Sequence, residues 1–288
     1  MKSRLQLLLF AVPALALYGG FFLLPAVQGL RYATTDWDGY SPSFTDVGLA
    51  NLTDVVSNDD LFRNALTNNL EFLLAVVIGQ TALALLLAVL LAARSRASTT
   101  LRALFFLPTV LSSVSVAFIW KFVYDPNFGL ANNLLGAVGL DRFQSAYLGE
   151  ESTAIFWVAV AQVWFHAGQM MVIYIAGINQ IPEELYEAAR TDGANRWQQF
   201  RHVTWPMVAP ATALVIAYTS LQSFKAFDLI LGLAGNPPRS GLDVLSTRIY
   251  TTFANGQLGY AAAESVVFMV AIAAVTFLQN RAARMAHG

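Results

Sequence analysis

Six apolar stretches, each close to the length of a membrane-spanning helix, constrain this 288-residue chain more than any other feature. A helix needs about 20 predominantly apolar residues to cross the hydrocarbon core of a bilayer. The stretches lie near Leu7–Leu30, Phe72–Ala92, Leu101–Val123, Ile155–Ile178, Met207–Leu231 and Ala261–Leu278. Because lipid offers no hydrogen-bond partner to the backbone, each stretch is expected to be helical. The sequence therefore predicts an all-α integral membrane protein with six transmembrane helices.

The composition supports a lipid-facing chain. Hydrophobic residues make up 56% of it and charged residues only 12%, about half the charged share of a typical soluble protein. The formal net charge of −1 lacks the strong basic excess of nucleic-acid-binding proteins, so no nucleic acid is expected as a partner. Because the chain has no cysteine, disulfides, thiolate nucleophiles and cysteine-based metal sites are excluded.

The charged residues outside the apolar stretches predict an orientation. With the N-terminus inside, ten basic residues fall on the inner side and five on the outer side, as the positive-inside rule requires. The inner residues are Lys2, Arg4, Arg94, Arg96, Arg102, Arg190, Arg196, Arg201, Arg281 and Arg284. Six crossings then place both termini in the cytoplasm. A signal peptide could also begin with Lys2 and Arg4, but the apolar run that follows is long for one, so we interpret it as an uncleaved transmembrane helix.

The segment 179–206, between the fourth and fifth stretches, has the pattern of two helices joined by a glycine turn. Pro182 suits a first helical turn, where no amide donor is needed. Gly193 suits the left-handed position after a helix end, and Asn195 with Gln198 can form a capping box on the next helix. The hairpin either projects from the cytoplasmic face or lies on the membrane surface as an amphipathic element.

The same segment resembles the EAA signature of ATP-binding-cassette (ABC) importer permeases. The residues that match it are Glu187, Ala188, Ala189, Asp192, Gly193 and Pro206. Trp205 stands where leucine is usual in that family, and we expect a larger apolar contact there with no change of role. The resemblance implies that this segment fits a cleft on a separate ATPase and couples its closure to the membrane helices.

Other motifs resemble the maltose-type permeases of the carbohydrate-uptake class. They include Leu107-Pro108, Phe128-Gly129 and Ile181-Pro182-Glu183-Glu184-Leu185. The resemblance implies a single permease domain over residues 1–288, with a core at 65–288. It also implies four kinds of partner: a second homologous permease, two ABC ATPase subunits, an extracellular solute-binding protein, and a sugar or sugar-like solute.

The chain carries no sign of catalytic chemistry of its own. It has no Gly-x-x-x-x-Gly-Lys-Ser/Thr phosphate loop, no Gly-x-Ser-x-Gly elbow and no His-Glu-x-x-His pair. The three histidines are far apart in sequence, so a metal site is not expected, and no cofactor is expected either. If transport is driven by ATP, another chain hydrolyses it. A secondary transporter and an intramembrane enzyme are the alternatives, although the former would normally show paired repeats and broken midplane helices.

Polar side chains inside the apolar stretches are candidates for the solute site. Gln162, His166 and Gln169 are spaced four and three apart, which places them on one helical face. Neutral amides, hydroxyls and imidazole can match sugar hydroxyls without burying charge. The resemblance implies that solute contacts come from three helices, through Thr109, Ser113, Gln162, His166, Gln169, Thr219, Gln222 and Ser223.

Each of these residues has an alternative interpretation. Polar side chains in membrane bundles often form hydrogen bonds between helices, and for the serines this is the favoured interpretation. Lys225 and Asp228 are either an outer gate or a pair of snorkelling surface charges. Lys121 and Glu264 are interpreted as interfacial charges.

Overall fold

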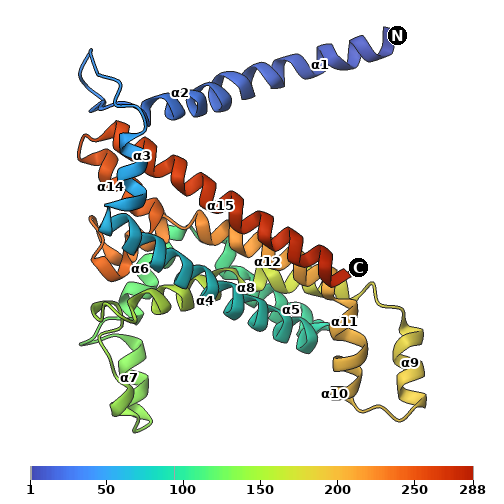
Figure 1. Ribbon diagram of the computed structural model, residues 1–288. Coiled ribbons are helices and arrows are strands. Elements are labelled where there is room, and N and C mark those ends of the chain that lie inside the picture. The colour runs from blue at the N-terminus through green and yellow to red at the C-terminus, as the bar shows by residue number, and fades with distance from the viewer. Residues whose placement is uncertain (1, 94, 288) are drawn as a thin grey trace. The chain divides into compact units, whose positions relative to one another are not determined.

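The computed structural model describes the backbone of residues 2–93 and 95–287 and the side chains of residues 10–93, 95–279 and 281–282. The predicted inner residues Lys2, Arg4, Arg94 and Arg284 lie outside the described side chains. Within the described residues the chain is helical and contains no strand, only an isolated bridge between Thr35 and Asp46 (Figure 1). The all-α prediction is therefore confirmed.

The helices follow one another along the whole chain. Their bounds are α1 Lys2–Tyr18, α2 Leu24–Tyr32, α3 Ala50–Ser57, α4 Asp60–Leu91, α5 Arg96–Phe106, α6 Ser113–Val123, α7 Leu130–Ala137, α8 Ala154–Ile178, α9 Glu183–Thr191, α10 Arg196–Gln199, α11 Trp205–Met207, α12 Ala209–Phe224, α13 Asp228–Ala234, α14 Leu245–Ala254 and α15 Leu258–His287. The chain divides into two compact units. One joins Met1–Arg63 to Arg248–Val275, and the other joins Asn64–Thr247 to Thr276–Gly288.

Four described helical segments are long and apolar enough to cross a membrane by themselves. They are Phe10–Tyr32, Asp60–Leu91, Ala154–Ile178 and Leu258–Gln279. Two further pairs of helices meet this criterion only when each pair is taken as one bent span, with bends of 102° after Val110 and 65° after Met207. The described part of the chain thus holds four candidate spans, or up to six.

The bends show that two apolar stretches are not single helices. In the third stretch, α5 leads into a 3₁₀ turn at Leu107–Val110, and Leu111 and Ser112 then take extended backbone angles. The hydroxyl of Ser112 accepts a hydrogen bond from the backbone N–H of Ser115 at 3.1 Å, so it caps the start of α6. The expectation of continuous helix over Leu101–Val123 was wrong, because this local cap begins a new helix.

The fifth stretch also ends earlier than its hydropathy indicates. α12 stops at Phe224, and α13 starts only at Asp228, so Met207–Leu231 is not one helix. The hydroxyl of Ser246 donates to the carbonyl of Ala226 at 2.9 Å and satisfies a backbone group exposed by the break. Hydropathy alone cannot locate such a break, because residues on both sides of it are apolar.

A buried charged cluster holds the first unit together. Glu264 on α15 is fully buried, and the Nε atom of Arg248 on α14 donates to it at 3.1 Å. Arg248 also approaches Asp59 at 3.4 Å, and the hydroxyl of Tyr260 donates to both Asp54 and Asp59 at 3.1 Å. The interpretation of Glu264 as an interfacial charge was wrong, because a paired arginine allows its carboxylate to be buried.

The loop between α2 and α3 is ordered by its own aspartates. Asp36 accepts hydrogen bonds from the backbone and the hydroxyl of Thr45, at 2.7 and 2.6 Å. The backbone and hydroxyl of Ser41, together with the backbone of Tyr40, donate to Asp38 and lower its pKa to about 2. Both carboxylates therefore serve as local acceptors that shape the loop.

Candidate functional site

A cavity of about 360 Å³ lies among α6, α8, α12 and α13, all in the second unit. Four of the predicted solute-site residues line it: Ser113, Gln162, His166 and Gln222. They come from three different helices, and the break after Phe224 brings the start of α13 to the same cavity. Amide, hydroxyl and imidazole groups therefore converge on one space, which is the kind of lining that recognises a neutral polar solute.

One cation and one anion also line the cavity. Lys225 follows the end of α12, and Asp228 starts α13. The Ser113 hydroxyl donates to Asp228 at 3.3 Å, whereas Lys225 and Asp228 make no ion pair with each other in the described part of the chain. The two charges are thus separate features of the cavity wall, and whether they form a gate stays a prediction.

A chain of amide hydrogen bonds runs behind the cavity. Gln80 on α4 is fully buried, and its Nε2 atom donates to Thr219 at 3.1 Å and to Gln222 at 3.4 Å. Gln222 in turn donates to Gln169 at 3.3 Å, and Gln169 donates to the hydroxyl of Tyr218 at 3.2 Å. Gln169 and Thr219 are therefore placed in a network that supports Gln222.

Sequence reasoning missed Gln80, although a signal for it was present. It is a polar residue inside the apolar stretch Phe72–Ala92, and polar residues at such positions usually face the interior of a bundle. Which helix Gln80 faces could not be predicted, because its partners are more than 130 positions away.

His166 presents an imidazole with spare hydrogen-bonding capacity. Its Nδ1 atom is buried and has no hydrogen-bond partner in the described part of the chain. The ring lies against Phe165, with centroids 4.0 Å apart. An imidazole held in this way can offer its free nitrogen to a hydroxyl in the cavity.

The remaining predicted residues bond to the backbone. The Thr109 hydroxyl donates to the carbonyl of Phe106 at 2.7 Å, and the Ser223 hydroxyl donates to the carbonyl of Thr219 at 2.9 Å. Neither residue lines the cavity among the side chains described. This geometry favours the alternative in which both hydroxyls serve helix structure.

Gly168 allows α8 to approach the bend before α6. A Cβ atom at this position would lie 2.0 Å from the carbonyl oxygen of Phe105 and 2.8 Å from the Cα of Phe106. Such contacts are sterically impossible, so only glycine permits this packing. The close approach sets the distance between the bend and the face of α8 that carries Gln162 and His166.

The segment 179–206 forms the expected helical hairpin. α9 begins after Pro182 with Glu183 and Glu184 in its first turn. Gly193 has a φ of +79°, and Asn195 and Gln198 form a reciprocal capping box with bonds of 2.9 and 2.8 Å. The local predictions for the turn glycine and the capping box are therefore confirmed, whereas Pro182 precedes the first turn of α9 instead of lying in it.

The residues that match the EAA signature lie mainly at the surface of this hairpin. Glu187, Ala188, Asp192, Gly193 and Pro206 are exposed and Ala189 is half-buried. The hydroxyls of Tyr186 and Thr204 are 2.9 Å apart and join α9 to the returning chain. In Figure 1, α9 and α10 extend away from α8 and α5, within the same unit. The hairpin therefore leaves a surface of small and acidic side chains free for a partner.

Comparison with known proteins identifies the family of this chain. Residues 80–285 match the model of the family described as "Binding-protein-dependent transport system inner membrane component". The chain is 35% identical to the probable ABC transporter permease protein YurN of Bacillus subtilis, over 95% of this chain and 94% of that protein. It is 34% identical to the diacetylchitobiose uptake system permease protein NgcF of Streptomyces coelicolor, over 93% of this chain and 80% of that protein.

A solved structure shares the fold. It is a bacterial alginate ABC transporter in complex with an alginate pentasaccharide-bound periplasmic protein. The match has a TM-score of 0.83 and covers 99% of this chain and 96% of that chain at 24% identity. The chain belongs to the family of binding-protein-dependent transport system inner membrane components, and it is a multi-pass permease subunit of an ABC importer rather than an enzyme.

Proposed function

We propose that this permease carries a neutral sugar or sugar-like solute through the cavity formed by α6, α8, α12 and α13. The observation that carries the proposal is the convergence of Ser113, Gln162, His166 and Gln222 on that cavity. Sugar hydroxyls both donate and accept hydrogen bonds, and these groups can satisfy both roles. The diacetylchitobiose permease among the relatives supports the same class of solute.

The permease forms half of the pathway. A second, homologous permease supplies the other half, two ABC ATPases bind below, and an extracellular solute-binding protein docks above. The family's description, as a component of binding-protein-dependent systems, supports the last of these partners. The exposed hairpin at 179–206 is the surface that meets the ATPase, within a single permease domain whose core is residues 65–288.

The importer's activity tests this proposal. The permease is assembled with its second permease, ATPase and binding protein in liposomes, and uptake of labelled neutral sugars and oligosaccharides is measured. Uptake should require both ATP and the loaded binding protein. Uptake driven by an ion gradient without ATP would contradict the coupling to an ATPase, whereas ATP-dependent uptake restricted to charged solutes would contradict the neutral class.

The proposed topology has six spans, with both bent pairs crossing the bilayer and both termini in the cytoplasm. The absence of native cysteine allows a direct test. With Ser57→Cys, an impermeant maleimide added to intact cells should label the protein, and with Gln198→Cys it should not. Labelling of the second variant from outside would place the hairpin on the wrong side for an ATPase.

Gln80 is expected to position Gln222 for the solute. Replacing Gln80 with methionine keeps its length but removes the donor that holds Thr219 and Gln222. Loss of one such hydrogen bond costs about 0.5–1.5 kcal/mol. Uptake, measured at a saturating concentration of solute-loaded binding protein, should therefore fall roughly two- to tenfold.

A matched control for this variant lies one residue further along α4. The Thr81 hydroxyl is buried and has no hydrogen-bond partner among the residues that the structure describes, so Thr81→Val should leave uptake unchanged. Gln80→Met could instead reduce the number of assembled complexes while each complex transports normally. That result would show that Gln80 only joins helices.

A further inference from the structure

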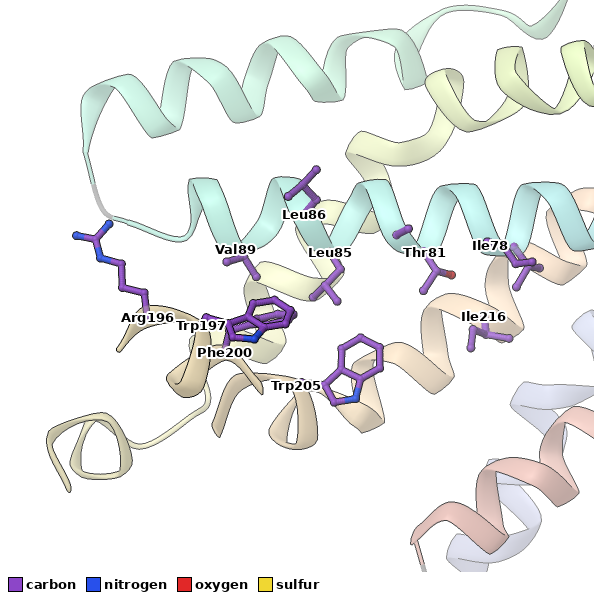
Figure 2. Close-up of a pocket in the computed structure, with 12 residues that line it drawn as sticks. Ile78, Thr81, Leu85, Leu86, Val89, Arg196, Trp197, Phe200, Trp205 and Ile216 are labelled. Atoms are coloured by element: carbon purple, nitrogen blue, oxygen red, sulfur yellow. The ribbon is translucent and has the colours of Figure 1, made fainter. Parts of the chain in front are cut away.

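An apolar groove runs along one side of α4 in the second unit (Figure 2), and it shares no lining residue with the proposed solute cavity. Its volume is about 730 Å³. One wall is formed by α4 from Val77 to Val89, and the other by Trp197, Phe200 and Trp205, with Ile216 at one end. Apart from Arg196 and Thr81, the lining side chains are hydrocarbon or aromatic. The groove therefore suits an occupant that is almost entirely apolar.

The length of the groove matches one leaflet of a bilayer. Val89 is 12 positions after Val77 on a continuous helix, which corresponds to about 18 Å at 1.5 Å per residue. The hydrocarbon core of a bilayer is about 30 Å thick, so each leaflet contributes about 15 Å. A single acyl chain extending from the membrane surface would fill the groove from end to end.

The groove carries its charge and one exposed indole ring, that of Trp197, near one end, whereas Trp205 lies about halfway along the groove in Figure 2. Arg196 lies beyond Val89 in Figure 2, near the end of α4, and it forms no ion pair in the described part of the chain. Trp197 and Trp205 are 65% and 52% exposed, although they are large aromatic side chains. Tryptophan is enriched at the level of lipid headgroups, and arginine binds phosphate with a planar fork of donors. This end of the groove is thus complementary to an anionic headgroup.

We propose that the groove is a binding site for one anionic phospholipid of the cytoplasmic leaflet, with an acyl chain along α4 and the phosphate on Arg196. A transmembrane helix of a partner subunit fits the groove less well. A helix that crosses the bilayer would need an apolar contact along the full length of the bilayer core, about 30 Å, whereas this groove ends near Val77.

Quenching of tryptophan fluorescence tests the site. The assembled importer is placed in phosphatidylcholine nanodiscs with increasing fractions of phosphatidylglycerol brominated in its acyl chains. Quenching should saturate at a low fraction of the brominated lipid, and Trp205→Phe should remove a large part of it. Arg196→Gln should weaken the apparent affinity about fivefold, since each basic residue near an anionic surface contributes about 1 kcal/mol.

The matched control is Arg201→Gln, which changes an exposed arginine of the same segment that does not line the groove. The apparent affinity of this variant for the brominated phosphatidylglycerol should equal that of the unmodified protein. Quenching that rises linearly with bromine content, and equally in all variants, would show only bulk lipid contact and overturn the site. Displacement of the brominated lipid by inorganic phosphate would assign Arg196 to a free anion and overturn it as well.

Crosslinking identifies the occupant directly. Ala82 is exposed within the groove, and the chain has no other cysteine to compete with Ala82→Cys. With a benzophenone maleimide on that cysteine, irradiation of the assembled importer should yield an adduct with the mass of a phospholipid. An adduct with the second permease as the main product would show that protein fills the groove, and it would contradict the proposal.

Discussion

Replacing Gly193 with proline is expected to abolish ATP-driven transport while the permease still inserts into the membrane. The native φ of +79° at this position is inaccessible to proline, whose ring fixes φ near −65°. The backbone N–H of Gly193 also donates to the carbonyl of Arg190 at 3.0 Å, and proline removes this donor. The turn between α9 and α10 would therefore change direction, and so would the surface that we propose to face the ATPase.

Gly193→Asn is the control for this change. Asparagine tolerates a left-handed backbone better than other residues that carry a side chain, and a Cβ atom at this position would meet nothing within 4 Å. Transport should therefore be largely retained. The measurements are solute-stimulated ATP hydrolysis and uptake by the purified complex. Normal stimulated hydrolysis with Gly193→Pro would show that the hairpin does not couple the two activities.

Ala188→Trp tests the same surface without changing the backbone. Ala188 is exposed on α9, so the indole can be accommodated in the isolated permease. Small residues let a helix seat closely in a groove, and a bulky ring should prevent this contact. Stimulated hydrolysis should be lost, whereas Ala14→Trp, at an exposed position on α1 outside the hairpin, should keep it.

The hairpin at 179–206 could be predicted in detail because its signals are local. The proline at the start of α9, the turn glycine and the capping box of Asn195 and Gln198 each act within a few residues. Local backbone preferences therefore determine the element before any tertiary contact forms. The bend at Leu111 and Ser112 was missed although its cap is also local, because an apolar stretch of spanning length was assumed to be one helix.

The burial of Glu264 could not be predicted for a different reason. A carboxylate near the end of an apolar stretch usually reaches the interface, and only the position of Arg248, 16 residues earlier, reverses that expectation. The proposed solute site was also only partly predictable, because the partners of its side chains are distant in sequence. The sequence indicated polar residues on α8 and α12. It did not indicate that Gln169 bonds to Gln222 while Gln162 lines the cavity.

Removing both cavity amides is expected to be the most damaging change at the solute site. Gln162 is 97% buried on α8, and Gln222 is half-buried on α12; both line the cavity. Each lost hydrogen bond to a neutral solute costs about 0.5–1.5 kcal/mol. The double variant Gln162→Ala with Gln222→Ala should therefore reduce uptake roughly 5- to 150-fold. Subunit assembly and basal ATP hydrolysis should remain near normal, since neither residue lies on the coupling hairpin.

Two comparisons distinguish solute binding from helix packing in this double variant. Ser223→Ala on α12 removes a hydroxyl whose one hydrogen bond within the described residues goes to the backbone of its own helix. Uptake by this variant should match that of the unmodified protein. Gln169→Ala should have an intermediate effect, because it withdraws the acceptor of Gln222 without opening the cavity wall. If the double variant fails to assemble, the two amides hold helices together. If it assembles and transports normally, the solute passes along another face of α8, and the proposed cavity is not the pathway.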